Sequence, residues 1–171
     1  MTNDFDLTTV RTSVRAEHAL GFVDLTDRLE EAIAATGLTD GFLVAYCRHT
    51  TCGLLINEWE DGAQEDLLAR LAALVPDGAY YAHDDLGRRT QNLVPDERAN
   101  GRAHVLQMIL GGTSQVVPVA GGRLQLGRWQ RLFLLELDEP KERVILIQAV
   151  GRCNLAPGVP LAETCELERS R

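Results

Sequence analysis

The sequence has no apolar run close to the roughly 20 residues that a membrane-spanning helix needs. Residues 1–6 are acidic and lack the basic-then-apolar order of a secretory signal peptide. Internal repeats and low-complexity segments are also missing. These absences argue against a membrane protein and predict a cytoplasmic protein that binds no membrane.

Basic residues are in the minority, since 17 lysines and arginines stand against 25 aspartates and glutamates, for a net charge of −8. Non-specific binding to nucleic acid needs basic surface that displaces counterions, so nucleic acid is not an expected partner. A local pocket can oppose the net charge, and a small anion therefore remains compatible with the composition.

Cysteine is sparse, and the four cysteines, Cys47, Cys52, Cys153 and Cys165, include no CxxC pair. This spacing is typical of free thiols rather than of a disulfide framework or a zinc ribbon. Cys47 lies in an apolar run and is interpreted as a small buried hydrophobic residue. A nucleophilic role for Cys52 is the less favoured interpretation, because only a histidine nearby would lower its pKa.

The remaining composition is that of one ordinary domain, with 171 residues, 45% hydrophobic and 25% charged. Apolar periodicity predicts a helix from the capping segment 24–27 to Gly37 and an amphipathic helix over 60–74. Its buried stripe would be Leu67, Leu68, Leu71 and Leu74. A short helix over 98–110 follows a long polar connection at 77–97, a length that is often functional. Strands are predicted at 7–15, 41–48, 53–57, 115–119, 123–126, 129–137 and 143–150.

The chain is therefore predicted to be an α+β domain over residues 1–151, followed by a tail at 152–171. The tail, from Cys153 onward, contains two prolines and several charges, and we expect it to pack loosely or to be partly disordered.

Three of the four histidines stand in polar surroundings: His49, His83 and His104. Imidazole is the usual ligand for zinc, and three ligands with an open fourth position are typical of a catalytic site. The pattern suggests a metal site, although three unrelated surface or hydrogen-bonded histidines remain the alternative. His18 is interpreted as structural or exposed.

Carboxylates and hydroxyls surround these histidines in the sequence. Glu58, Asp61, Asp66 and Asp84 could orient a metal-bound histidine or act as a general base, whereas a solvated helix face equally explains Asp66. Thr50, Thr51, Thr113 and Ser114 suit phosphate oxygens, although Gly-Gly-Thr-Ser is also an ordinary turn. Gln125, Trp129 and Gln130 add amide and aromatic surface, with core packing as the alternative for Trp129.

Four segments, taken in order, resemble the YjbQ family of secondary thiamine-phosphate synthases. They are Arg48-His-Thr-Thr-Cys-Gly-Leu-Leu-Ile-Asn-Glu58, Tyr81-Ala-His-Asp84, Asn100-Gly-Arg-Ala-His104 and Gly122-Arg-Leu-Gln-Leu-Gly-Arg-Trp-Gln130. The resemblance covers about residues 5–151. Two positions depart from it: Cys52 stands where the family usually has a smaller residue, and Arg128 where threonine is common.

The resemblance implies a two-sheet β-sandwich flanked by helices that assembles as a homotrimer. It implies a divalent metal, zinc, at His49, His83 and His104, and a transferase activity that joins a pyrimidine diphosphate to a thiazole phosphate with release of pyrophosphate. Glu58 and Asp66 are the expected catalytic carboxylates. The expected substrate-binding residues are Thr50, Thr51, Asn57, Ser114, Gln125, Trp129 and Gln130. The alternatives are a metal-dependent hydrolase of a phosphorylated small molecule and a non-catalytic metal- or metabolite-binding protein.

Overall fold

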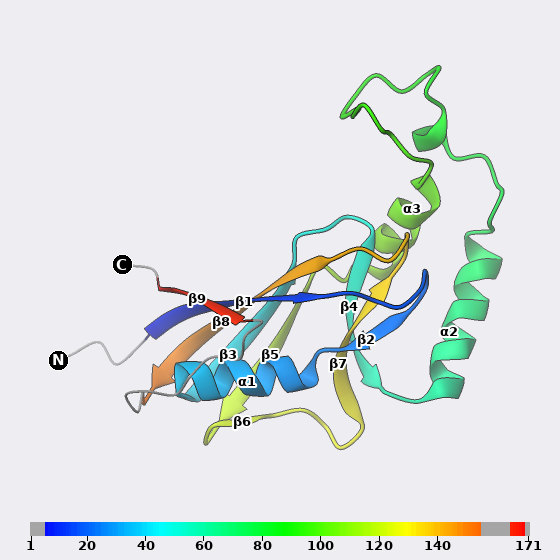
Figure 1. Ribbon diagram of the computed structural model, residues 1–171. Coiled ribbons are helices and arrows are strands. Elements are labelled where there is room, and N and C mark those ends of the chain that lie inside the picture. The colour runs from blue at the N-terminus through cyan, green and yellow to red at the C-terminus, as the bar shows by residue number, and fades with distance from the viewer. Residues whose placement is uncertain (1–5, 155–164, 170–171) are drawn as a thin grey trace.

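The computed structural model describes residues 6–154 and, for the backbone alone, Cys165–Arg169. These residues form two antiparallel sheets and three α-helices, which confirms the predicted α+β class with two sheets (Figure 1). The larger sheet has the order β6-β5-β3-β8-β1-β9 and the smaller the order β2-β7-β4. The strands are β1 Asp6–Val14, β2 Phe22–Asp24, β3 Leu38–Cys47, β4 Cys52–Glu58, β5 Ser114–Ala120, β6 Arg123–Leu124, β7 Gln130–Glu136, β8 Arg143–Cys153 and β9 Cys165–Arg169.

The first helix, α1 (Thr26–Thr36), begins and ends where the sequence predicts. The Asp24 carboxylate accepts a hydrogen bond from the Thr26 amide at 2.8 Å, satisfying a free donor of the first turn. Gly37 closes the helix in the left-handed conformation, with φ of 66°, and its amide donates to the Ile33 carbonyl. Both boundaries are therefore fixed by residues next to the helix.

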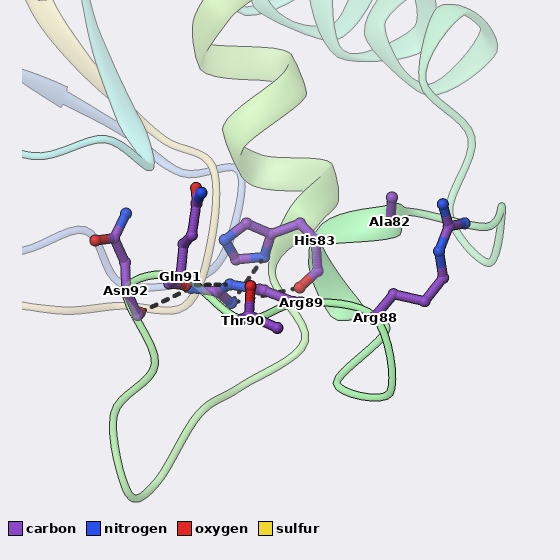
Figure 2. Close-up of a pocket in the computed structure, with 7 residues that line it drawn as sticks. All are labelled: Ala82, His83, Arg88, Arg89, Thr90, Gln91 and Asn92. Atoms are coloured by element: carbon purple, nitrogen blue, oxygen red, sulfur yellow. Dashed lines mark hydrogen bonds between the residues drawn. The ribbon is translucent and has the colours of Figure 1, made fainter.

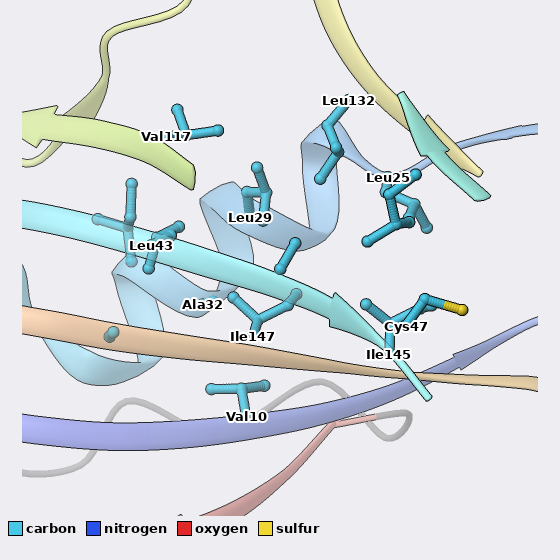
Figure 3. Packing of buried hydrophobic residues seen from close by; sticks show 14 of the residues in the cluster. Val10, Leu25, Leu29, Ala32, Leu43, Cys47, Val117, Leu132, Ile145 and Ile147 are labelled. Atoms are coloured by element: carbon cyan, nitrogen blue, oxygen red, sulfur yellow. The ribbon is translucent and has the colours of Figure 1, made fainter. Parts of the chain in front are cut away.

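The main hydrophobic core lies between the larger sheet and a layer made of α1 and the smaller sheet (Figure 3). Alternate residues of β3 and β8, such as Leu43 and Ile147, are fully buried against Leu29 of α1. Because strand side chains alternate between faces, this packing explains the period-two pattern of the β-rich segments. Leu54 and Leu132 of the smaller sheet also pack into this core.

A second core lies on the other face of the smaller sheet. Leu135 and Leu137 pack there against α2 (Asp61–Leu74) and α3 (Gly101–Leu110), chiefly through Leu71 and Leu106. The smaller sheet is therefore covered on both faces. Strand β2, which the sequence does not predict, pairs with β7 and has only three residues, too few to carry a periodic signal.

Helix α2 corrects the predicted buried stripe. Leu71 is buried and Leu67 and Leu68 are half-buried, but Leu74 is 65% exposed. The Glu60 carboxylate caps the helix by accepting from the amides of Gly62 and Ala63. Only one side of the C-terminal half of α2 packs against the rest of the domain. The four leucines therefore do not form the predicted buried stripe.

The C-terminal part of the chain also differs from expectation. Strand β8 continues to Cys153, and the backbone of β9 pairs antiparallel with β1. Loose packing is therefore the wrong prediction for Cys165–Arg169, while residues 155–164 lie outside the described residues. The predicted return strand at 123–126 is shorter, since β6 ends at Leu124.

The outer face of the larger sheet is uncovered by any other element of the described chain. Phe42, Tyr46 and Val116 lie on this face and are 37%, 45% and 56% exposed. None of the helices in the described residues is long and apolar enough to cross a membrane.

Candidate functional site

His83 and His104 are brought together by two elements that follow each other in the chain. His83 lies in the short helix η1 (Ala82–Asp84), and His104 lies in the first turn of α3. Their ring centroids are 4.5 Å apart, with 40° between the ring planes. Two of the three histidines singled out in the sequence are therefore neighbours.

The glycine at the start of α3 allows this approach. A Cβ atom on Gly101 would lie 2.8 Å from the Tyr81 Cβ and 3.0 Å from the His83 Cβ, both closer than atoms normally pack. The Asp84 carboxylate accepts hydrogen bonds from the amides of Asn100 and Gly101, at 2.9 and 2.8 Å. Asp84 thus caps α3 and ties η1 to it, in addition to lying 3.4 Å from the His83 ring nitrogen Nδ1.

Beside the pair lies an open cavity of about 530 Å³, formed by the polar connection after η1 (Figure 2). Its lining residues are Ala82, His83, Arg88, Arg89, Thr90, Gln91 and Asn92. The sequence indicated that this long connection was functional, but it did not single out either arginine. The consecutive basic pair Arg88-Arg89, in a chain of net charge −8, was the available signal.

Arg89 holds the connection in shape. Its guanidinium forms an ion pair with Glu97 at 2.5 Å and donates to the carbonyls of Gln91 and Asn92 at 3.1 and 2.9 Å. Its Nη1 also lies 3.4 Å from His83 Nδ1. The hydrogen bond from Arg89 lowers the pKa of the Glu97 carboxyl. The carboxylate, and with it the ion pair, therefore persists to a lower pH than that at which a glutamate usually becomes protonated.

The electrostatics of the pair favour an uncharged His104. Burial lowers the pKa of its imidazole, and the electrostatic influence of the neighbouring His83 and Arg89 lowers it further. A neutral imidazole is the form that binds metals and accepts protons. His104 can therefore supply a nitrogen ligand or a base near neutral pH.

His49 lies in the connection between β3 and β4 and has a different set of partners. Its Nε2 accepts a hydrogen bond from the Val144 amide at 3.0 Å. Burial, and then the positive charge of Arg143, lower the pKa of His49. Next to it the Thr51 hydroxyl, expected to contact an anion, is buried and accepts from Arg143 Nη2 at 3.1 Å, whereas Thr50 is exposed.

Arg143 also forms a buried ion pair with Glu136 that the sequence did not reveal. The two contacts, Nε to Oε2 and Nη2 to Oε1, measure 2.7 and 2.5 Å, and the side chains are 4% and 0% exposed. The only available signal was a glutamate inside the apolar run of β7.

Two thiols flank the same connection. Cys47 at the end of β3 and Cys52 at the start of β4 are 1% and 0% exposed, and their sulfurs lie 3.2 Å apart. Both are free, as predicted, and the predicted burial of Cys47 is confirmed, but the burial of Cys52 and the proximity of the two sulfurs were not foreseen. The hydrogen bond shared between them lowers the pKa of Cys47 and raises that of Cys52.

A three-histidine cluster is not assembled within the part of the chain that the structure describes. No group of three or more histidine, cysteine, aspartate or glutamate side chains there is spaced to hold a metal ion. The described residues thus bring His83 and His104 together without His49, and the metal stays a prediction.

Several of the predicted site residues lie at the end of β4 that is farther from His49. Asn57 and Glu58 pair with Arg131 and Gln130 of β7, whereas Cys52, next to the His49 connection, pairs with Glu136. Seven strand residues separate these ends by about 20 Å. Asn57 accepts from the Glu58 amide, and Gln130 accepts from the Gly127 amide, so each amide side chain is engaged by a backbone group close to it in the chain.

The other predicted residues are also separate from the histidine pair. Gln125 donates to the Arg123 carbonyl at 3.0 Å within its own loop. Trp129 is 61% exposed and carries the Arg128 guanidinium 4.5 Å from its ring centroid, so the core-packing alternative is wrong. Asp66 is exposed on α2, and Ser114 is exposed at the start of β5, opposite Tyr46.

Comparison with known proteins identifies relatives along most of the chain. Residues 10–152 match the family model described as UPF0047 protein YjbQ-like. A UPF0047 protein of Archaeoglobus fulgidus is 38% identical over 142 residues, covering 83% of this chain and 98% of that protein. The UPF0047 protein YugU of Bacillus subtilis is 32% identical, covering 83% of this chain and 96% of YugU.

Solved structures agree with the sequence relatives. A YbjQ-like protein of unknown function from Sulfolobus solfataricus P2 superposes with a TM-score of 0.73 at 30% identity, covering 86% of this chain and 99% of that one. A hypothetical protein from Aeropyrum pernix K1 gives 0.69 at 34% identity, covering 81% and 95%. On the match over residues 10–152 and on these relatives, the chain belongs to the YjbQ (UPF0047) family.

Proposed function

We propose that this protein is an enzyme that acts on a phosphorylated small molecule in the cavity beside His83 and His104. The observation that carries this proposal is the contact of the two imidazoles next to a cavity lined by Arg88 and Arg89. Convergent polar groups around a concave surface are typical of small-molecule sites.

Arg88 is the expected anchor for the phosphate. It is exposed at the cavity, and one N–H group donates to the Tyr80 hydroxyl at 3.0 Å, which leaves further donors for a ligand. Guanidinium groups bind phosphate oxygens in pairs, which favours this residue for an anion. Arg89 is already engaged by Glu97 and two carbonyls, so its part is to hold the cavity wall.

A divalent metal, zinc, is part of the proposal. The neutral form favoured at His104 and the adjacent ring of His83 suit nitrogen ligation. The family resemblance adds His49, whose Nε2 would have to exchange its hydrogen bond with the Val144 amide for the metal. When bound, such a metal would supply a positive charge that stabilises a departing pyrophosphate.

The finer proposal is thiamine-phosphate synthesis: joining a pyrimidine diphosphate to a thiazole phosphate with release of pyrophosphate. Glu58 and Asp66 stay the proposed carboxylates, but each lies outside the cavity of its own chain. Their part therefore depends on a proposed homotrimer. The uncovered apolar face of the larger sheet, with Phe42 and Tyr46, supports assembly of this kind.

The test measures metal content and turnover of the purified protein, with His104→Ala as the variant and His18→Ala as the matched control. His18 is exposed and is not among the residues that line the cavity, so its loss should change neither quantity. We expect His104→Ala to lose bound zinc and at least tenfold of kcat/KM. Equal zinc and activity in the two variants would contradict the proposed site.

The products distinguish the alternatives. Pyrophosphate released together with thiamine phosphate indicates the synthase, and inorganic phosphate without a coupled product indicates the hydrolase. Saturable binding of the pyrimidine diphosphate with no turnover indicates the non-catalytic binding protein.

A further inference from the structure

The two buried thiols lie where two strands of different sheets come together. Cys47 ends β3 of the larger sheet, and Cys52 begins β4 of the smaller one. Only residues 48–51 connect them, and this connection includes His49, Thr50 and Thr51. A covalent bond between the sulfurs would therefore join the two sheets at this end of the molecule.

The geometry is close to that of a disulfide. The sulfurs are 3.2 Å apart, so they must approach by about 1.2 Å to reach the S–S bond length of about 2.0 Å. The backbone on both sides is already held: the Cys47 amide donates to the Thr113 carbonyl at 2.8 Å, and the Leu137 amide donates to the Thr51 carbonyl at 3.1 Å. Rotation of the two side chains can supply so small a movement while these hydrogen bonds stay in place.

Chance packing explains the contact less well. A buried cysteine behaves as a small hydrophobic side chain, and many residues can fill such a space. Here both positions carry a thiol, each points its sulfur at the other, and both are at most 1% exposed. Cys153, by comparison, is half-buried, and its sulfur lies 4.0 Å from a carbonyl oxygen.

We propose that Cys47 and Cys52 are a redox modification site that a peroxide oxidises reversibly to an intramolecular disulfide. In the first step one sulfur attacks the peroxide, the O–O bond breaks, and a sulfenic acid and one water form. In the second step the other thiol displaces the sulfenic hydroxyl as water, and the S–S bond forms. The pair loses two electrons and two protons, hydrogen peroxide is reduced to two waters, and a dithiol reverses the reaction.

Because Cys47 and Cys52 flank residues 48–51, a disulfide between them would change how this connection moves. Arg48 and Thr50 are exposed, so a local opening of residues 48–51 is enough to admit a molecule as small as hydrogen peroxide. Once formed, the disulfide opposes that same opening, because it closes a ring of six residues around the connection. Oxidation would thus restrict the segment that holds His49 and Thr51.

The chain is well suited to a direct test by peptide mapping. Trypsin cleaves after Arg48, between the two cysteines, and yields the separate peptides 29–48 and 49–70. After reduction, removal of the reductant and treatment with hydrogen peroxide, we expect these peptides to appear joined, with a mass two hydrogens below their sum. Dithiothreitol should separate them again.

Three controls make the result decisive. The variant Cys153→Ala/Cys165→Ala keeps only the pair and should give the joined peptides as efficiently as the wild type. Cys52→Ala should give none. Met108 is 69% exposed, and its oxidation to the sulfoxide reports that the peroxide was active on the protein.

Two outcomes would overturn the proposal. In the first, Met108 is oxidised while Cys47 and Cys52 remain open to alkylation after denaturation. In the second, oxidation leaves the pair as separate sulfinic acids or joins either cysteine to Cys153 or Cys165.

Discussion

Replacing Arg143 with methionine removes one partner of the buried ion pair with Glu136. Methionine keeps most of the length and the apolar part of the arginine side chain, but it cannot donate a hydrogen bond. The change leaves the Glu136 carboxylate, 0% exposed, with the hydrogen bond from the Asp138 amide at 3.0 Å but without its cationic partner. It also removes the donor to the Thr51 hydroxyl.

The size of the effect follows from the burial of both groups. Breaking a buried ion pair by removing one partner costs about 3–5 kcal/mol, because the other charge remains in a medium of low polarity. In a domain of this length, 1 kcal/mol lowers the melting temperature by about 2–4 °C. We therefore expect Arg143→Met to melt about 6–20 °C below the wild type.

The assay is urea unfolding followed by circular dichroism, with a chelator present so that no bound metal contributes to stability. The unfolding midpoint and its slope give the free energy of unfolding for each variant. The double variant Glu136→Leu/Arg143→Met removes both charges together and should recover most of the loss, since no unpaired charge remains.

A matched surface pair supplies the control. Arg152 and Asp40 are 3.4 Å apart with side chains 63% and 51% exposed, so Arg152→Met should change the free energy of unfolding by about 1 kcal/mol or less. If Arg143→Met also costs less than about 1 kcal/mol, or if the double variant is no more stable than the single one, the argument from burial is wrong.

Three further predictions concern the histidine pair. Gly101→Ala places a Cβ 2.8 Å from the Tyr81 Cβ, and a crystal structure of the variant should show η1 displaced from α3. Because burial holds the folded pKa of His104 below its usual value of 6.5, stability is full above that pH and falls as the pH drops through the lower folded pKa. Urea midpoints at about pH 7.5 and about pH 5.5 should therefore differ less in His104→Gln than in the wild type. Arg89→Met, which frees Glu97, should speed amide hydrogen exchange in residues 85–98 and leave exchange in β3 unchanged.

The sequence alone determined most of the secondary structure. The first helix is bounded by Asp24 and Gly37, and the strands β3 and β8 follow the alternation of apolar residues. These features depend on residues close in the chain, through capping hydrogen bonds and side-chain periodicity. The prediction missed β2, whose three residues are too few to show a periodic pattern. It was wrong for Leu74, which was expected in the buried stripe of α2 but is exposed.

The arrangement of the site was decided by the tertiary structure. His83 meets His104 because Gly101 lets η1 approach α3 and Asp84 caps that helix, and no periodic pattern records either contact. Asn57 and Glu58, close to His49 in the sequence, lie at the far end of β4, because an extended strand carries the chain about 3.3 Å per residue. The sequence could name the residue types that suit a phosphate and metal site. Their distances depend on strand register and on contacts between distant segments, and these exist only once the chain has folded.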